Sequence, residues 1–300
     1  MGNAVDKKAR TVSRRTKAGI AVIVACLAAG GIWYHMAGRL GHWPETVLDL
    51  GNNVKMRLVL IPAGKFMMGS PATEGGRNSE EGPQHEVTIS KSFYMGVFEV
   101  TQEQYEQVMG DNPSYFKGSG NPVENIASWD DAVAFCKKLS TKTGKKVTLP
   151  TEAQWEYACR AGTTTAFHTG DALKPGQANA NIQQTSNPGV WDAIMALVGR
   201  SSAQKTSLRT TPAGSFPPNG FGLYNMHGNV SEWCSDWYSM KYYAHSPKTD
   251  PQGPDSKFDR VVRGGNWGAS PQFCRSAFRD HYSPTSRGND IGFRVVLESQ

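Results

Sequence analysis

The sequence predicts an α+β domain with much irregular loop, preceded by one transmembrane helix. The chain of 300 residues contains 32 glycines and 8 tryptophans, which favours many turns and large aromatic anchors over a helical bundle. Only three segments carry clear helix start signals, and residues 18–38 form a long apolar run. These features divide the chain into a basic cytoplasmic tail at 1–17, an anchor at 18–38, a linker at 39–50 and a folded domain at 51–300.

The apolar run at 18–38, AGIAVIVACLAAGGIWYHMAG, contains no Lys, Arg, Asp or Glu and is long enough to cross the hydrocarbon core of a membrane. A basic segment precedes it, and positive charge stays on the cytoplasmic side. We therefore expect the membrane as a partner and the domain outside the cytoplasm, in the periplasm or at the cell surface. A lipoprotein with Cys26 lipidated is the alternative, and both forms tether the domain to a membrane.

The positive charge of the chain is confined to its beginning. Residues 1–40 contain seven lysines and arginines and a single acid, Asp6, which gives a net +6, and the whole chain also has a net charge of +6. The remaining chain is therefore neutral overall. Because binding to phosphate backbones needs excess positive charge, we expect no nucleic acid partner.

The first part of the folded domain is predicted to be strands and loops. Apolar runs at 56–61 and 65–68 flank Pro62-Ala63-Gly64, which predicts a hairpin. Alternating residues at 85–89 predict another strand, and the polar residues 71–83 predict a surface loop. A short apolar strand is expected near the C-terminus at 291–297.

Three helices are predicted to begin near Thr101, Ser128 and Thr151. Thr and Gln three residues apart at 101–104 and 151–154 fit the capping box, in which two side chains satisfy free backbone N–H groups. Glycines at 110, 144 and 162 mark the expected ends. Acids cluster at two of the starts, where the helix dipole accounts for them without catalysis: Asp130, Asp131, Glu152 and Glu156.

Residues 162–220 are rich in Thr, Asn, Gln, Gly and Pro, and so predict a long irregular region. The segment that follows, FGLYNMHGNVSEWCSDW at 221–237, combines aromatic anchors with turn-forming glycine and asparagine. It is too aromatic for a solvated loop, so we expect a compact turn buried against a core. Its polar side chains must then find partners, which are either backbone groups or a hard cation.

The motifs of this domain, in their order, resemble the formylglycine-generating enzyme family, also called the sulfatase-modifying factor family. The resemblance covers essentially everything after the linker and implies a variant of the C-type lectin-like fold. It assigns a fold and leaves the chemistry to be argued from the site. The motifs are FMMGS at 66, EVTQEQY at 99, SWDDAVAFC at 128, LPTEAQWEYACRAG at 149, FPPNGFGLYNMHGNVSEW at 216, RVVRGGNW at 260 and GFR at 292.

The resemblance raises the question of copper chemistry. In the family's oxidases, two cysteines separated by four residues bind copper in the stretch after a GGS motif, because soft thiolates suit Cu(I). The matching stretch here, GGNWGASPQFCRSAFR, has Asn266 in place of the serine and Cys274 as its one cysteine. We therefore expect no copper and no copper-dependent oxidase activity. The seven histidines show no paired ligand spacing either.

The other cysteines leave their pairing open. By the resemblance, Cys136 and Cys159 match positions that form disulfides in some exported relatives, but the partner positions hold Ser276 and Val295. Cys234 with Cys274 is one possible disulfide, and buried free thiols are the alternative.

The resemblance also implies structural calcium. The turn at 221–237 matches the family's calcium-binding turn, with side-chain oxygens at Asn225 and Glu232 and backbone carbonyls at Gly228 and Val230. Oxygen ligands, a carboxylate and a tight turn are what Ca²⁺ requires. A second family site would use Asn181 and Ile182, and its aspartate cannot be placed in this sequence.

Three functions follow as expectations. The first is a binding or accessory module for a protein or peptide ligand, with aromatic and arginine residues typical of recognition surfaces. An exported oxidase that modifies a protein or peptide is the second. The third is a surface ligand-binding protein diversified by a retroelement, because the Asn, Asp, Ser, His, Tyr and Gly residues between Asp280 and Asp290 are reachable by mutating adenines in asparagine codons. The expected ligand surface comprises Asn266, Trp267, Phe273, Arg275, Phe278, Arg279, His281 and Tyr282.

Overall fold

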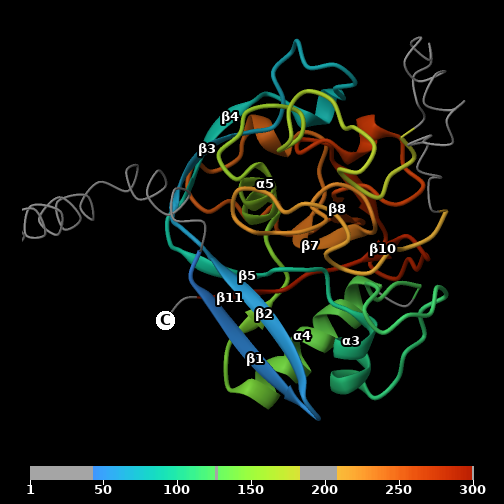
Figure 1. The fold of residues 1–300 in the computed structure, drawn as a ribbon. Coiled ribbons are helices and arrows are strands. Elements are labelled where there is room, and N and C mark those ends of the chain that lie inside the picture. The colour runs from blue at the N-terminus through green and yellow to red at the C-terminus, as the bar shows by residue number, and fades with distance from the viewer. Residues whose placement is uncertain (1–42, 126–127, 183–207, 299–300) are drawn as a thin grey trace, which may run out of the picture. The chain divides into compact units, whose positions relative to one another are not determined.

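The computed structural model describes residues 43–125, 128–182 and 208–298. These belong to a compact unit that begins at Trp43. The predicted cytoplasmic tail, the anchor and the first residues of the linker lie outside the described residues. Within the described residues no helix is long and apolar enough to span a membrane. The fold is mixed α/β with few helices (Figure 1).

A five-stranded sheet has the order β1-β2-β5-β11-β6. Its strands are β1 (Glu45–Gly51), β2 (Val54–Ile61), β5 (Phe93–Gly96), β11 (Val296–Glu298) and β6 (Val147–Thr148). The C-terminal strand pairs with β5 on one side and β6 on the other, so the end of the chain closes the sheet that its first strands begin. The closing strand predicted over 291–297 is present as two short strands, at 291–292 and 296–298, with a break at 293–295.

The structure corrects two predictions about this region. Residues 45–50, expected in the linker, form most of β1, which pairs antiparallel with β2 and buries Leu48 and Leu50. The predicted hairpin of 56–61 with 65–68 is wrong, because β3 (Gly64–Met68) pairs with β4 (His85–Ile89) instead. The alternating apolar residues of 45–50 indicated a strand, but the flanking Pro44 favoured a linker.

Helices α3 (Gln102–Met109) and α4 (Trp129–Thr143) contact each other and pack on β1 (Figure 1). Their starts are confirmed, since Thr101 and Gln104 form a capping box and the Ser128 side chain accepts the N–H of Asp131. The left-handed residues Gly110 and Gly144 end them. Phe135 and Leu139 of α4 enter the main core.

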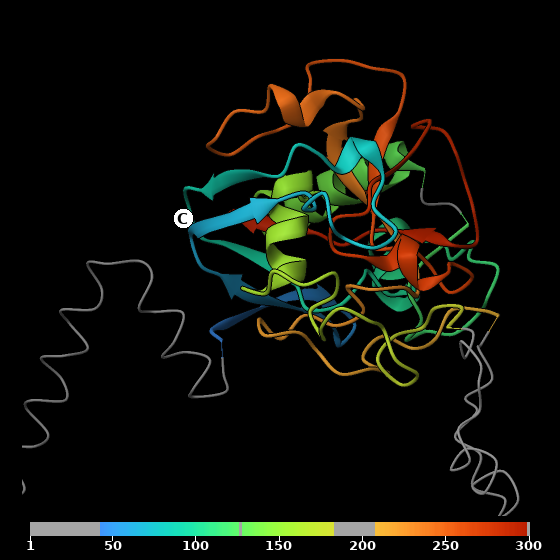
Figure 2. The ribbon, with the colours of Figure 1, turned by 90° about the horizontal axis from the view of Figure 1, so that it is seen from above.

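A second sheet, of order β10-β7-β8-β9, lies beside α5 (Figure 2). Its strands are β10 (Ile291–Gly292), β7 (Ser231–Trp237), β8 (Arg260–Arg263) and β9 (Asp280–Tyr282). Helix α5 (Glu152–Arg160) begins at the capping box of Thr151 and Gln154 and ends at Ala161 in the left-handed conformation, one residue before the predicted glycine. Helix α5 therefore joins this sheet to β3 and β4.

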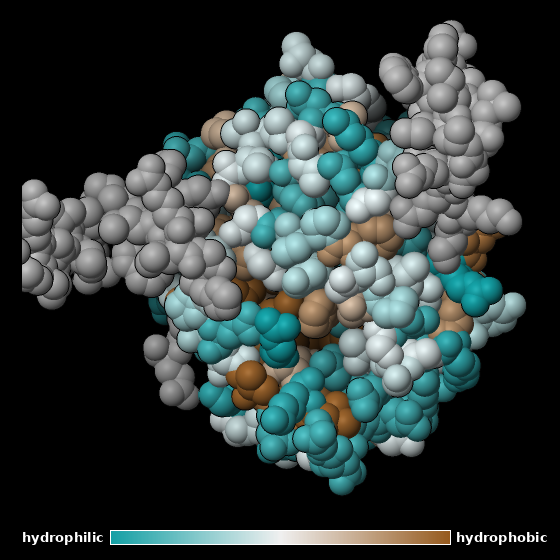
Figure 3. All heavy atoms as spheres, in the orientation of Figure 1, coloured by the Kyte–Doolittle hydropathy of each residue, from teal (hydrophilic) through white to brown (hydrophobic). Residues whose placement is uncertain are grey.

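The irregular regions are built from turns held on the two sheets. Short 3-10 helices occur at η1 (Ser79–Glu81), η2 (Tyr242–Ala244) and η3 (Pro271–Cys274). The face in Figure 3 is mainly hydrophilic, with hydrophobic residues in small separate groups. The described surface has several exposed large hydrophobic side chains, of which Phe258 is the most exposed at 91%.

Candidate functional site

The predicted calcium turn is buried and its tight bends are real. Asn225 and Asn229 adopt the left-handed conformation, with φ of 56° and 67°. Gly228 is also left-handed, and a Cβ atom there would lie 2.3 Å from the carbonyl oxygen of Asn179. Only glycine therefore fits this position. Asn229 is fully buried, so the Asn229-Val230-Ser231 sequon is inaccessible for glycosylation.

Glu232 forms a bidentate pair with a buried arginine. Its Oε1 accepts from Nη2 of Arg294 at 2.6 Å, and its Oε2 accepts from Nε of Arg294 at 2.6 Å and from Nε1 of Trp155 at 2.8 Å. Burial lowers the pKa of Arg294, but Glu232 outweighs this and holds it above its usual value. The carboxylate expected to bind calcium is thus already held by protein groups, and a cation would share its remaining lone pairs.

Glu99 is a member of this cluster that sequence reasoning missed. Its carboxylate is fully buried and accepts from Nδ2 of Asn225 at 3.0 Å and from Nδ2 of Asn229 at 2.9 Å. Burial raises the pKa of Glu99 to about 7, Arg294 opposes the shift and Glu232 adds to it. An acid two residues before a helix cap, in EVTQ, was the available signal.

Two observations indicate that a cation fits this cluster. The Oδ1 atom of Asn225 is buried without a hydrogen-bond partner among the described residues. In addition, two carboxylates, Glu99 and Glu232, face one guanidinium, Arg294, so a negative charge is left over when both are ionised. Asn225, Glu232 and the carbonyls of Gly228 and Val230 would hold calcium, and its role there would be to neutralise this charge and fix the turn.

The second predicted calcium site is only partly described. The N–H of Asn181 donates to the carbonyl of Ala269 at 2.8 Å, and the N–H of Ile182 donates to that of Ala180 at 2.8 Å. The first bond places Asn181 beside the stretch that follows the two glycines at 264 and 265. The segment that would supply further ligands, 183–207, lies outside the described residues.

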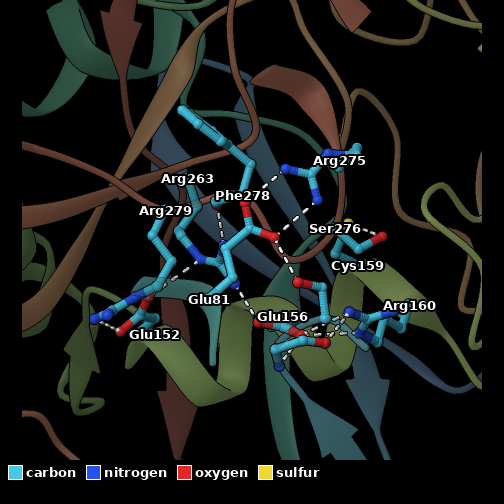
Figure 4. Close-up of polar contacts among 12 residues, drawn as sticks. Glu81, Glu152, Glu156, Cys159, Arg160, Arg263, Arg275, Ser276, Phe278 and Arg279 are labelled. Atoms are coloured by element: carbon cyan, nitrogen blue, oxygen red, sulfur yellow. Dashed lines mark hydrogen bonds and ion pairs between the residues drawn. The ribbon is translucent and has the colours of Figure 1, made fainter. Parts of the chain in front are cut away.

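The eight residues of the expected ligand surface do not lie together on one surface. The main correction concerns the two arginines, which are buried. Arg275 and Arg279 are each only 2% exposed and therefore cannot contact a ligand. Arg275 donates to Oε2 of Glu81 at 2.8 Å and also pairs with Glu74, while Arg279 donates to both oxygens of Glu152 at 2.7 and 2.8 Å (Figure 4). Both are structural, since Arg275 fastens its loop to the segment at 74–81 and Arg279 fastens its loop to α5.

These pairs belong to a buried ionic network around α5. Glu156 accepts from Nε of Arg160 at 2.9 Å and also pairs with Arg263 (Figure 4). Burial raises the pKa of Glu152, but Arg279 and Arg263 outweigh it and hold that pKa below its usual value. The two acids predicted at the start of α5 for the helix dipole are therefore ion-pair partners of distant arginines.

The remaining surface residues fall in separate places. Phe273 is 40% exposed and packs edge-on against Phe278, which is buried. His281 is exposed, stacks on Tyr238 at 4.0 Å and lies 2.8 Å from Oδ2 of Asp259 through its Nδ1. Tyr282 packs edge-on against Trp233.

Asn266 and Trp267, by contrast, belong to one polar and aromatic cluster. Nδ2 of Asn266 donates to Oδ2 of Asp290 at 3.0 Å, and Nε1 of Trp267 donates to the carbonyl of Asn289 at 3.1 Å. The ring of Trp267 meets that of Phe116 edge-to-face at 5.6 Å. We name as the Trp267 face the residues Tyr115, Phe116, Glu124, Asn266, Trp267 and Asp290.

The described cysteines are all buried and free. The possible disulfide between Cys234 and Cys274 is wrong, because both are unpaired thiols. Burial raises the pKa of Cys274 to about 12, so this thiol is protonated at neutral pH. Sγ of Cys159 lies 3.6 Å from Oγ of Ser276, and Cys136 shares the main core with Val295. Of the two positions implied as disulfide partners, Ser276 therefore lies close to a cysteine, Cys159.

Two histidines of the described domain, His168 and His227, lie side by side in the interior. His227 is fully enclosed, with its Nδ1 2.7 Å from the carbonyl of Cys274 and its Nε2 accepting from the N–H of His168 at 3.1 Å. Burial lowers the pKa of His227 to about 3 and that of His168 to about 4. Over the described ranges, no group of three or more His, Cys, Asp or Glu side chains is arranged to hold a metal ion.

Comparison with known proteins finds one family. Residues 49–299 match the model of the sulfatase-modifying factor enzyme 1-like domain. The chain is 32% identical over 299 residues to a formylglycine-generating enzyme of Mus musculus, which covers 81% of this chain and 75% of that protein. The solved structure of PvdO from Pseudomonas aeruginosa is 32% identical with a TM-score of 0.69, covering 86% of this chain and 100% of that one. Treponema denticola variable protein 1 is 27% identical with a TM-score of 0.69, over 85% of this chain and 99% of that one.

Proposed function

This chain belongs to the formylglycine-generating enzyme, or sulfatase-modifying factor, family, and on that premise we propose that it is a binding or accessory module without copper oxidase activity. In this proposal the N-terminal segment anchors it to a membrane and its domain faces the periplasm or the cell exterior. The basic tail at 1–17 and the apolar run at 18–38 support the anchor.

The observation that carries the proposal is the state of Cys274. It is the one cysteine of residues 264–282, whereas the family's copper site uses two thiols separated by four residues. The position five residues earlier is Ala269, which packs in the same small core as Cys274. Cu(I) binds thiolates, whereas Cys274 is a protonated thiol and alanine stands at the position of the second cysteine. This pair of residues is therefore a poor site for Cu(I).

The Trp267 face supports a binding role. Its aromatic rings and polar side chains reach the surface, with Tyr115 67% exposed and Trp267 half-buried. Aromatic anchors bordered by hydrogen-bonding groups are typical of recognition surfaces. A protein or peptide is therefore the proposed ligand, and calcium in the turn at 225–232 is the proposed structural cofactor.

The test compares the wild-type chain with Ala269→Cys, which recreates the family's spacing of two cysteines. Both proteins are titrated with Cu(I) and then incubated with a cysteine-containing sulfatase peptide, copper and oxygen. Mass spectrometry reports any aldehyde. We expect no aldehyde and weak copper binding from the wild type, and at least tenfold tighter copper binding by the variant. Aldehyde formation by the wild type would overturn the proposal and favour the exported oxidase.

A second function, a surface protein diversified by a retroelement, is favoured by one comparison. The chain is similar over most of its length to Treponema denticola variable protein 1. The segment 280–290 also presents exposed side chains at His281, Ser283, Thr285 and Arg287. The test is genomic, because a diversified protein needs a nearby reverse transcriptase gene and a template repeat matching this segment. The absence of both from the locus would end this alternative.

A further inference from the structure

A cavity of about 670 Å³ lies between the five-stranded sheet and the loop that joins α4 to β6. Leu60 pairs with Tyr94 across β2 and β5, and Tyr94 pairs with Leu297 across β5 and β11. Because directly paired residues of neighbouring strands point to the same face of a sheet, these three side chains form one apolar row. We name this space the Lys145 cavity, and its lining includes Thr46, Leu60, Tyr94, Lys145, Lys146 and Leu297.

The two lysines of the cavity stand on a short loop whose ends are fixed. Gly144 ends α4 in the left-handed conformation, with φ of 67°, and its N–H donates to the carbonyl of Ser140 at 2.9 Å. Val147 belongs to β6, which pairs with β11, and its N–H donates to Oγ of Ser140 at 3.0 Å. The backbone of Lys145 and Lys146 is therefore held at the rim of the cavity.

This rim is positively charged. Lys146 pairs with Glu298 at 2.5 Å, but the two side chains are 67% and 61% exposed, so the pair is weak. Lys145 is exposed and forms no ion pair in the described part of the chain. Residues 137–148 contain five lysines and no acid, whereas the chain after residue 40 has no net charge. The domain therefore has a positive potential on this side, which attracts anions.

The lining suits an anion that carries a short apolar part. The volume of the cavity is within the range of small-molecule sites, about 300–1,000 Å³. Two ammonium groups can each bind a phosphate oxygen through a charge-assisted hydrogen bond, and the hydroxyl of Thr46 can donate one more. The apolar row offers contact to carbon atoms next to the phosphate. A phosphodiester that carries glycerol carbons combines these features.

The position of the cavity in the sequence indicates the source of the phosphodiester. The proposed anchor ends at residue 38, eight positions before Thr46. Eight extended residues span at most about 28 Å, so β1 begins within that reach of the membrane surface. Anionic lipid headgroups are concentrated at such a surface, and they attract basic residues that lie near it.

We propose that the Lys145 cavity binds the headgroup of an anionic phospholipid of the membrane to which the chain is anchored. This inference rests on the anchor in the proposed function and goes beyond it, because it adds a second contact with the membrane. Lys145 and Lys146 hold the phosphate, and the apolar row contacts the glycerol carbons. The bound headgroup restricts the rotation of the domain relative to the membrane.

The experiment titrates the full chain in a neutral detergent with short-chain lipids and measures binding by calorimetry. Dihexanoyl phosphatidylglycerol carries the anionic headgroup, dihexanoyl phosphatidylcholine is the match without net charge, and inorganic phosphate is the free anion. We expect the phosphatidylglycerol to bind at least tenfold tighter than the other two, with an affinity that falls as salt is added.

Two double variants separate the cavity from general attraction. Lys145→Gln with Lys146→Gln removes both ammonium groups of the rim and should weaken binding of the phosphatidylglycerol about tenfold. Lys137→Gln with Lys138→Gln removes the same charge from exposed positions of α4 outside the cavity. This control should weaken binding by less than about threefold, because exposed charges at a distance are screened. Melting curves confirm that each variant folds.

Equal affinity for the two lipids, or binding of neither, would overturn the inference. Equal losses in the two double variants would also overturn it, since they indicate general attraction, and so would phosphate that binds as tightly as the lipid. Alkaline extraction of membranes tests the anchor separately. A chain that stays in the membrane without a lipid preference refutes this inference alone, whereas a chain that is released refutes the anchor of the proposed function.

Discussion

Replacing Ser276 with cysteine should create a disulfide with Cys159. The Sγ of Cys159 and the Oγ of Ser276 already lie 3.6 Å apart, and both side chains are fully buried. The backbone N–H of Ser276 is held by the carbonyl of Ala166 at 2.8 Å, so its Cβ is fixed in place. A small closing movement of two side chains would reach the bond length of a disulfide, about 2.05 Å.

The size of the effect follows from the loop that the bond would close. The two residues are 117 positions apart, and the loop-entropy relation gives about 5 kcal/mol of stabilisation as an upper value. Residual structure in the unfolded chain and strain in the folded one reduce this to about 2–4 kcal/mol. For a domain of this size, that corresponds to a rise in melting temperature of about 4–16 °C.

The assay is a thiol count under denaturing conditions, combined with melting curves in the presence and absence of reductant. The full chain has five cysteines; the oxidised variant should have four free thiols out of six. Its gain in melting temperature should vanish with reductant. The control is the double variant Cys159→Ala and Ser276→Cys, which cannot form this bond. Six free thiols after mild oxidation, with an unchanged melting temperature, would refute the reasoning from geometry.

Three further predictions concern the buried charges. Glu152→Gln should lower the free energy of unfolding, measured in urea, by about 3–5 kcal/mol, since it leaves buried Arg279 without its carboxylate. The control, Glu86→Gln, removes an exposed ion pair and should lower it by less than about 1 kcal/mol. Equal losses in the two variants would contradict a buried network. The pKa of Glu99 is raised from its usual 4.5 to about 7 in the folded protein. Between pH 4.5 and pH 7 the folded state therefore binds more protons than the unfolded state. Without bound metal, stability should therefore fall by about 3 kcal/mol from pH 4.5 to 7, and Glu99→Gln should flatten that slope in urea titrations. Calcium should raise the melting temperature at pH 8 and a chelator should reverse the rise, with Asn225→Ala abolishing the response; a full response in that variant would place the ion elsewhere.

The local elements could be predicted from the sequence because their causes are local. The capping residues at Thr101 and Thr151 and the glycines at 110 and 144 act within one turn of helix, so the helices begin and end close to the predicted positions. The ordered motifs identified the family, and the missing second thiol near Cys274 could be read directly.

Tertiary structure decided which polar residues meet a ligand and which hold the fold. Arg275 and Arg279 looked like surface anchors, but their carboxylate partners lie 194 and 127 residues away in the chain, at Glu81 and Glu152. The same folding buried Glu99 against Asn225 and brought Asn125 beside the loop that ends at Asp290. No sequence spacing encodes such contacts, because the charge on a side chain is local whereas its burial and its partner depend on the whole fold.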